Sequence, residues 1–199
     1  MTVDNSVETK LASKEENTKI PEFTRRVLIP KEQILVRNRE LAKQIAKDYE
    51  GEDVIAIIVL NGAMIFGSNL LIETNGHSSA RLFLDTMRAK SYNKTERGKL
   101  EITKDNELDV KGKKVLLIED IVDSGHTINS LKNHLMEKGA EEIKVCALLS
   151  KPSRREVEVH IDYLGFEIDN IWVEGYGLDT DEENRFFPDI MYRDYTITT

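Results

Sequence analysis

Two adjacent carboxylates followed by a turn of small and hydroxyl residues form the most chemically informative stretch of the sequence. Glu119 and Asp120 follow an apolar run at 115–118, and a turn over 120–127 leads into a helical pattern at 128–138. Consecutive amide N–H groups at the start of a helix bind a phosphate dianion, and a glycine in the turn lets the backbone approach the anion closely. The carboxylates can accept hydrogen bonds from sugar hydroxyls or help to hold hydrated Mg²⁺. The pattern therefore predicts a sugar phosphate site.

A plainer interpretation of the same stretch is structural. Glu119 and Asp120 would then only begin a loop, and Asp123 or Ser124 would cap the helix that follows. The two interpretations differ in whether the helix start is capped by a side chain or left open for a ligand.

The elements around this stretch predict an α/β fold with a doubly wound, mainly parallel sheet. The runs at 54–60, 115–118 and 143–149 are continuously apolar, as strands covered on both faces are. Strand, helix and strand in succession imply a right-handed parallel crossover, with ligands bound at the carboxyl ends of the strands. The expected helices are 31–49, 63–72 and 128–138. The expected strands are 25–28, 54–60, 80–87, 100–102, 115–118, 143–149, 157–164, 171–173 and 190–192.

The chain of 199 residues suits one domain with a small appended lobe. Residues 1–22 are mostly polar and charged, and we expect them to form a flexible N-terminal arm. Residues 23–199 are expected to form the single domain. Its core spans about 30–155, and a hood lobe comes from about 23–29 and 156–199.

Composition excludes several classes of function. The net charge of -8 opposes sequence-independent binding to nucleic acid, which needs a basic face. The longest apolar run, at 54–66, is interrupted by Asn61 and Gly62 and is too short to span a bilayer. Cys146 is the only cysteine, so no intrachain disulfide can form. We therefore expect a cytoplasmic protein that binds neither nucleic acid nor membrane.

The segment 116–127 resembles the signature that binds phosphoribosyl pyrophosphate in type I phosphoribosyltransferases. A P-loop is excluded, because the chain has no Gly-x-x-x-x-Gly-Lys-Ser/Thr. Four further segments resemble the hypoxanthine–guanine phosphoribosyltransferase family, and the resemblance runs from about Val27 to Tyr192. It implies the type I phosphoribosyltransferase fold with a hood from the chain termini. It also implies Mg²⁺-dependent transfer of the 5-phosphoribosyl group to hypoxanthine or guanine, giving IMP or GMP and pyrophosphate.

The resemblance also implies roles for individual residues. The ribose and its 5-phosphate would be bound by Glu119, Asp120, Asp123, Ser124, Gly125, His126 and Thr127. Asp123 would lie near N7 of the purine and act as general base or stabilise charge there. Asp179, together with Glu119 and Asp120, would position the metal ion.

The base and the pyrophosphate would be held by segments from both halves of the chain. Lys151 would donate to O6 of the purine, Trp172 would stack on the ring, and Val173 would contact its edge through the backbone. The pyrophosphate would be bound by Arg185 and by Asn61 and Gly62, in a loop whose peptide before residue 61 is typically cis in this family. Ser91 and Tyr92 would belong to a mobile lid within 90–99. Taken singly, each of these features has a plainer alternative. Lys151 could be a solvated lysine, Trp172 a core residue and Asp179 part of a surface turn. The segment 90–99 could be an ordinary exposed hairpin loop.

The sequence departs from the family pattern at three positions. Asn61 stands where Lys or Arg is usual, His126 replaces a common Lys, and Glu174 stands where an apolar residue is usual beside the base. The preference among hypoxanthine, guanine and xanthine therefore stays open. A xanthine-preferring enzyme, a regulator that senses phosphoribosyl pyrophosphate and a paralogue with a decayed site are the rival hypotheses. The family implies a homodimer or homotetramer, with the helix at 63–72 as a contact surface.

Overall fold

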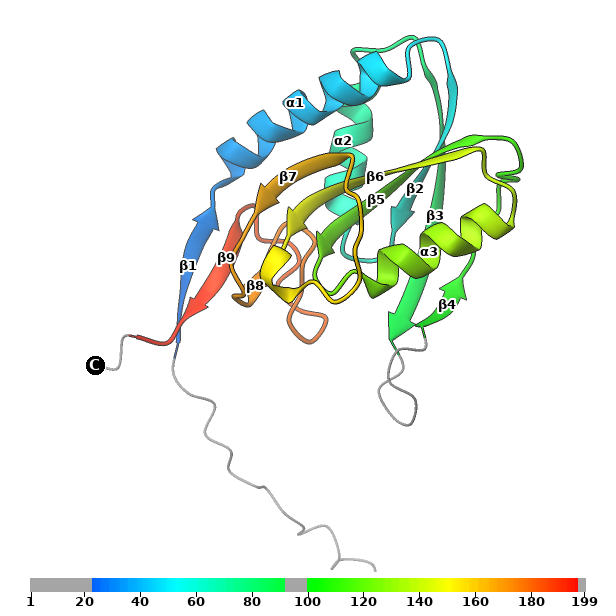
Figure 1. Cartoon of the computed structure of the whole chain (residues 1–199). Helices are drawn as coiled ribbons and strands as arrows, with labels where there is room; N and C mark the ends of the chain where they lie inside the picture. The colour runs from blue at the N-terminus through cyan, green and yellow to red at the C-terminus, as the bar shows by residue number, and fades with distance from the viewer. Residues whose placement is uncertain (1–22, 92–99, 197–199) are drawn as a thin grey trace, which may run out of the picture.

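A six-stranded, mainly parallel sheet forms the centre of the molecule. The computed structural model describes residues 23–91 and 100–196. The strand order is β4-β3-β2-β5-β6-β7, and only β4 runs antiparallel to its neighbour (Figure 1). The strands are β2 (Asp53–Val59), β3 (Arg81–Ser91), β4 (Leu100–Lys104), β5 (Lys114–Val122), β6 (Glu142–Ser150) and β7 (Tyr163–Glu167). The predicted doubly wound sheet is confirmed.

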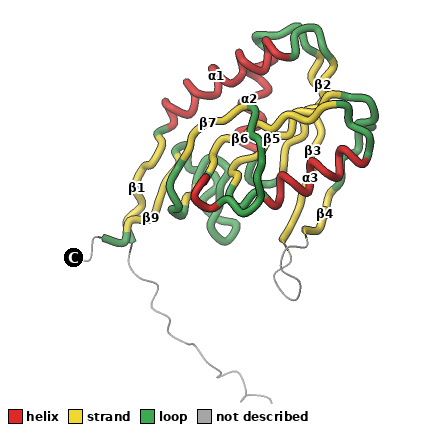
Figure 2. Tube along the Cα trace, in the orientation of Figure 1, coloured by secondary structure: helices red, strands yellow, loops and turns green. Residues whose placement is uncertain are grey.

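Helices cover both faces of this sheet (Figure 2). Helices α1 (Lys31–Asp48) and α2 (Met64–Asn75) pack on one face and α3 (His126–Glu137) on the other. Successive residues of β2 alternate between the two cores: Ile58 packs with residues of α1 and α2, and Ile57 with residues of α3. This alternation explains why the strand is apolar at every position, since both of its faces are buried.

The order of the strands creates a crevice between β2 and β5. The crossover after β2, through α2, leads to β3 on one side of the pair, whereas the crossover after β5, through α3, leads to β6 on the other side. Because β2 and β5 are parallel neighbours, their carboxyl ends flank the point where the winding reverses. Open α/β sheets bind ligands at such a point.

Both ends of the described chain build a small lobe beside this edge of the sheet. Its antiparallel strands β1 (Thr24–Ile29), β9 (Ile190–Asp194) and β8 (Val173–Glu174) lie in the order β1-β9-β8 (Figure 1). This three-stranded sheet is the expected lobe from the chain termini. Residues 156–199 do not all belong to the lobe, because β7 lies after residue 156 and is the edge strand of the large sheet.

The strand expected at 157–164 is wrong. Residues 157–162 are irregular, and β7 begins at Tyr163. The amides of Glu156 and Val157 both donate to the carbonyl oxygen of Ser124, at 3.0 Å each, so this segment packs against the turn before α3 instead of pairing in a sheet. The expected turn over 120–127 is also shorter than predicted, because β5 continues to Val122.

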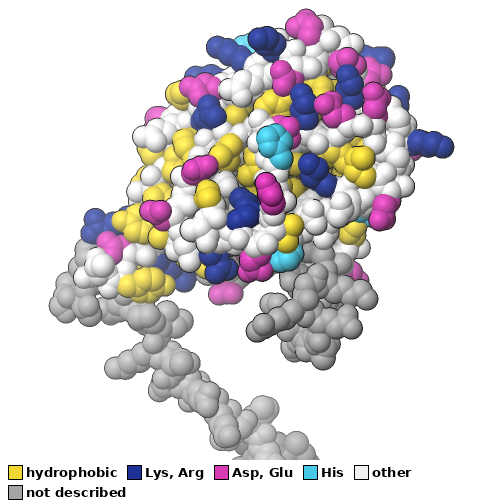
Figure 3. All heavy atoms as spheres, viewed as in Figure 1, with side chains coloured by type: hydrophobic (Ala, Val, Ile, Leu, Met, Phe, Trp, Pro, Cys, Tyr) yellow, Lys and Arg dark blue, Asp and Glu magenta, His cyan; other side chains and the backbone are white. Residues whose placement is uncertain are grey.

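Within residues 23–91 and 100–196, no helix is both long and apolar enough to cross a membrane. On the face shown in Figure 3, Lys and Arg side chains are interspersed with Asp and Glu, without a continuous stripe of either sign. The N-terminal arm expected at 1–22 lies outside the described residues.

Candidate active site

A polar cavity of about 310 Å³ lies at the crevice between β2 and β5. The end of β2, the end of β5, the strand β3 and a loop between β8 and β9 contribute to it. Its polar and glycine lining comprises Asn61, Gly62, Arg88, Lys90, Glu119, Asp120, Thr127, Asp179, Glu182 and Arg185. The structure therefore brings the expected pyrophosphate and metal residues to one place, whereas only Glu119, Asp120 and Thr127 of the expected ribose and 5-phosphate residues line the cavity.

Glu119 and Asp120 form an acidic pair that lines this cavity, with Glu119 buried and Asp120 partly buried. Oδ1 of Asp120 accepts from the amide of Ile121 at 2.8 Å, and a Cβ added to Gly62 would lie 1.7 Å from Oδ2 of Asp120. A larger residue at position 62 would therefore displace this carboxylate. Burial, followed by the charge of Asp120, raises the pKa of Glu119 well above its usual value. Such a pair favours a ligand that brings positive charge or hydroxyl donors.

The turn before α3 is open for an anion. Gly125 is the N-cap residue with φ 92°, and no side chain among the described residues caps the helix. The alternative in which Asp123 or Ser124 caps α3 is therefore wrong, and the first amides of the helix are left for a ligand. A Cβ on Gly125 would lie 2.5 Å from the carbonyl oxygen of Val157, so this position also requires glycine.

The neighbouring side chains of the turn are held by partners that the sequence analysis did not identify. Nε of Arg154 donates to Oδ1 of Asp123 at 3.1 Å. His126 lies 3.1 Å from a carboxylate oxygen of Glu156, through its Nε2. Arg154 belongs to a short 3₁₀ helix at Pro152–Arg154, directly after β6. Its guanidinium thus orients the expected general base.

Lys151 is a buried lysine at the end of β6. It is 7% exposed, and its amide donates to the carbonyl oxygen of Val122 at 3.0 Å, which ties it to the end of β5. Its ammonium has no hydrogen bond or ion pair to another residue of the described chain. Burial lowers its pKa, and the charge of Asp123 opposes this effect. The side chain of Lys151 is thus largely buried, and its amine is available for a ligand's oxygen.

Arg185 and Asp179 form the opposite wall of the cavity. Nη1 of Arg185 lies 3.0 Å from Oδ1 of Asp179 and donates to the carbonyl oxygen of Gly177 at 2.8 Å. A Cβ on Gly177 would lie 2.0 Å from the carbonyl oxygen of Gly62. The two loops are thus in direct backbone contact. The peptide before residue 61 is cis, as the family resemblance implies.

The expected base-binding residues lie outside this cavity. Trp172 is 58% exposed, so the core alternative is wrong, and its Nε1 donates to Oγ1 of Thr180 at 2.7 Å. Val173 is buried in β8. Glu174 does not line the cavity: its carboxylate is fully buried and pairs with Arg25 and Arg193 of the lobe.

The residues around the cavity fit a magnesium ion that is bound mainly through its substrate. Within residues 23–91 and 100–196, no three His, Cys, Asp or Glu side chains lie close enough together to hold a metal on their own. Glu119, Asp120 and Asp179 nevertheless line the same cavity. Mg²⁺ commonly uses one or two carboxylates and completes its shell with water and substrate phosphates.

Arg88, Lys90 and Glu182 also line the cavity and were not predicted from the sequence. Arg88 and Lys90 are alternate residues of β3, and period two places alternate side chains on one face of a strand, which was the available signal. Glu182 accepts from Nη2 of Arg185 at 2.7 Å. Ser91 is the last residue of β3, and Tyr92 of the expected lid lies outside the described residues.

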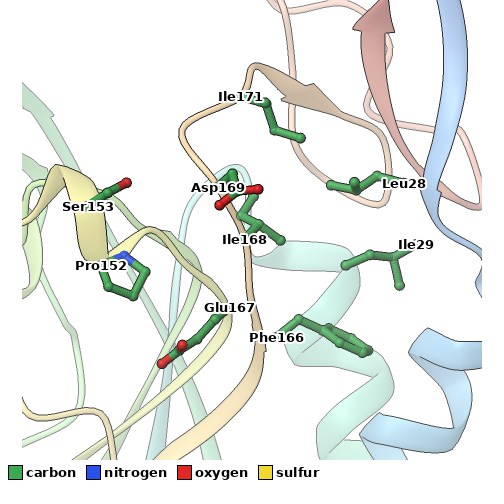
Figure 4. A pocket seen from close by; sticks show the side chains of 9 residues that line it. All are labelled: Leu28, Ile29, Pro152, Ser153, Phe166, Glu167, Ile168, Asp169 and Ile171. Atoms are coloured by element: carbon green, nitrogen blue, oxygen red, sulfur yellow. The ribbon is translucent and has the colours of Figure 1, made fainter.

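A second, larger cavity of about 510 Å³ lies between β1 and the segment 166–171. Leu28 and Ile29 face Ile168 and Ile171 across it, beside Pro152 and Ser153 (Figure 4). None of the expected site residues lines it. We place the site in the smaller cavity because the titratable and anion-binding groups converge there.

Comparisons with known proteins show the family to which the chain belongs. The family model for the phosphoribosyl transferase domain matches residues 29–181. The chain is 35% identical to the hypoxanthine-guanine phosphoribosyltransferase of Aquifex aeolicus over 83% of this chain and 92% of that protein. It is 36% identical to the hypoxanthine phosphoribosyltransferase of Escherichia coli K12, over 81% and 91% of the two chains. A crystal structure of a hypoxanthine-guanine phosphoribosyltransferase from Bacillus anthracis superposes with a TM-score of 0.78 at 37% identity, covering 86% of this chain and 98% of that one. The chain therefore belongs to the phosphoribosyltransferase family, in its hypoxanthine–guanine branch.

Proposed function

We propose that this protein transfers the 5-phosphoribosyl group of phosphoribosyl pyrophosphate to hypoxanthine or guanine, forming IMP or GMP and pyrophosphate. One observation carries the proposal. An acidic pair and an uncapped helix start lie at the two ends of one short segment, beside a cavity that Arg185 also lines. A sugar phosphate has a neutral diol and an anionic end, and this arrangement complements both.

The binding roles follow from the positions of the groups. The amides at the start of α3, with Ser124 and Thr127, bind the 5-phosphate, and Glu119 and Asp120 accept hydrogen bonds from the ribose hydroxyls. The pyrophosphate is bound by Arg185, by Arg88 and Lys90, and by the backbone of Asn61 and Gly62. Asp179 and the acidic pair hold Mg²⁺, which neutralises the charge that develops on the leaving pyrophosphate.

The base is oriented by groups that do not line the smaller cavity. Lys151 donates to O6 of an oxopurine, and a 6-amino group would instead direct its hydrogens at the ammonium, which disfavours adenine. Trp172 stacks on the ring, and Val173 contacts its edge. Asp123, held by Arg154, accepts the proton or stabilises the charge that develops at N7 as N9 attacks the anomeric carbon. A lid that includes Ser91 and Tyr92 excludes water from the cationic transition state.

A panel of bases tests this function. The protein is incubated with phosphoribosyl pyrophosphate, Mg²⁺ and, separately, hypoxanthine, guanine, xanthine and adenine, and formation of the monophosphate is followed. We expect turnover of hypoxanthine or guanine and none of adenine. Turnover of xanthine alone would contradict the preference but keep the reaction. Binding of phosphoribosyl pyrophosphate without any turnover, together with binding to DNA or RNA, would favour the regulator instead.

We also propose a cytoplasmic homodimer or homotetramer. The exposed apolar side chains of Met64 and Ile72 on α2 support a subunit contact there. Sedimentation equilibrium of the wild type and of Ile72→Glu tests this, and a monomeric wild type would refute it.

A further inference from the structure

We propose that Glu174 and Thr180 act as positioning residues that hold the indole of Trp172 in the orientation needed to bind the purine. This inference rests on the proposed role of Trp172 in base binding. It concerns side chains that lie outside the cavity at the end of β5.

Three side chains form a continuous chain of hydrogen bonds. Nε1 of Trp172 donates to Oγ1 of Thr180 at 2.7 Å, and Oγ1 of Thr180 donates to Oε2 of Glu174 at 2.7 Å. The carboxylate of Glu174 is fully buried in β8. The exposed ring is therefore connected through one hydroxyl to a fixed charge inside the lobe.

The buried carboxylate is itself held from several directions. Nε of Arg25 lies 2.5 Å from Oε1 of Glu174, and Nη2 of Arg193 lies 3.2 Å from Oε2. Nδ2 of Asn184 also donates to Oε2, at 3.2 Å. Arg25 and Arg193 lie on β1 and β9, so the carboxylate is bonded to both of the other strands of the lobe.

Each hydrogen bond from Trp172 through Thr180 to Glu174 can have only one donor and one acceptor. Burial raises the pKa of Glu174, but the hydrogen bonds from Thr180 and Arg25 and the charges of Arg25 and Arg193 outweigh it and hold the pKa below its usual value. The ionised carboxylate can only accept, so the single hydroxyl proton of Thr180 is directed to it. The oxygen of Thr180 is then left to accept, and the indole N–H is a donor only. The ionised Glu174 thus directs the hydroxyl proton of Thr180 away from Trp172 and leaves the oxygen free to accept from the indole.

This tether matters because little else fixes the ring. Trp172 is 58% exposed, whereas a core tryptophan would be oriented by packing on both faces. One hydrogen bond from its only donor thus restricts rotation of the indole while leaving ring surface open. A flat ring that is already oriented loses less conformational freedom when a base stacks on it, and the base is bound more tightly.

The chain offers a direct reporter of this geometry, because Trp172 is its only tryptophan. We would measure the fluorescence anisotropy of Trp172 and the steady-state kinetics in the wild type, in Thr180→Val, which removes the hydroxyl at nearly constant shape, and in Thr180→Ser, which restores it. In Thr180→Val we expect lower anisotropy and a KM for the base that is raised about 2- to 12-fold, as for the loss of one neutral hydrogen bond. The KM for phosphoribosyl pyrophosphate should stay within about twofold, and Thr180→Ser should recover both readouts.

A double-mutant cycle separates the tether from a general effect of Thr180. Trp172→Phe keeps a flat ring but has no N–H, so it breaks the same bond from the other side. If the two residues act through that bond, adding Thr180→Val to Trp172→Phe should change the KM for the base no further. Additive effects of the two substitutions would overturn the proposal.

The same experiment distinguishes failure of the tether from failure of the proposed base site. Unchanged anisotropy and unchanged KM for the base in Thr180→Val would overturn the tether. If Trp172→Ala still raises the KM for the base strongly, the proposed base site stands without the tether. If Trp172→Ala has no effect on that KM, the base role of Trp172 fails, and the tether fails with it.

Discussion

Replacing Lys151 by methionine should weaken catalysis and strengthen the fold at the same time. The side chain is 7% exposed, and its ammonium has no partner within the described chain. In the complex it would form a charge-assisted hydrogen bond to O6 of the base. The loss of such a bond costs about 1.5–3 kcal/mol, which corresponds to a decrease of roughly 10- to 150-fold in kcat/KM for the oxopurine.

The effect on stability has the opposite sign. Burial lowers the pKa of Lys151, so the folded state of the free enzyme is destabilised by the desolvated charge. Methionine fills a similar volume without that charge, and we expect the free energy of unfolding at pH 7 to rise by about 0.5–2 kcal/mol. The lysine is charged in both states at pH below its folded-state pKa, so the penalty is fully present there. As the pH rises from the folded-state pKa toward 10.5, the lysine of the folded protein becomes neutral. The difference in the free energy of unfolding between the wild type and Lys151→Met should then shrink.

The effect on stability is measured by urea denaturation without substrates. The effect on catalysis is measured by initial rates with saturating phosphoribosyl pyrophosphate. Lys113→Met is the matched control, because Lys113 is exposed and should give little change in either assay. A Lys151→Met protein that is less stable than the wild type, or that keeps its kcat/KM for hypoxanthine, would refute the assignment of Lys151 as a substrate-binding lysine.

Three other perturbations test neighbouring parts of the site. Gly177→Ala should raise the KM for phosphoribosyl pyrophosphate at least about tenfold, because its Cβ would lie 2.0 Å from a carbonyl oxygen of the facing loop. Gly112→Ala is the control in initial-rate assays, since it shares a positive φ but meets nothing within 4 Å; equal effects of the two would contradict the argument. Glu174→Gln should lower stability above pH 4.5. The folded-state pKa of Glu174 is depressed, so its contribution to stability is present above pH 4.5 and is lost as the pH falls through the folded-state pKa. The difference in the free energy of unfolding between the wild type and Glu174→Gln should therefore narrow in acid denaturation. A difference in the free energy of unfolding that widens toward low pH would contradict this prediction. Asp123→Asn should lower kcat on the order of 100-fold with little change in the KM for phosphoribosyl pyrophosphate; single-turnover rates within a few-fold of wild type would exclude the proposed role.

The parts of the fold set by local pattern were predictable from the sequence. The apolar run at 54–60 corresponds to β2 at Asp53–Val59, because a strand buried on both faces has no polar positions. The helical spacing after Pro30 corresponds to α1 at Lys31–Asp48. The segment from Glu119 to Thr127 joins a strand to a helix as predicted, although its turn is shorter than expected.

The parts that depend on distant contacts were not predictable. Val157, Val159 and Ile161 alternate as in a strand, but the backbone at 156 and 157 bonds to Ser124 instead of to a neighbouring strand. Nothing in the local sequence of Glu174 shows that it faces Arg25 and Arg193, because those partners come from the two ends of the chain. Ion pairs of this kind depend on the assembled lobe.

The pairing of β1 with β9 has a consequence for how the protein is made. In the register of this pair Thr24 lies opposite Asp194, so one of the first described residues to leave the ribosome needs one of the last as its partner. The large sheet needs only strands up to β7 and can form while synthesis continues. The lobe must wait for β9, which lies between β1 and β8, and Arg193 can reach Glu174 only after β9 has been made. The sheet of the lobe should therefore be the last part of the described chain to fold during synthesis.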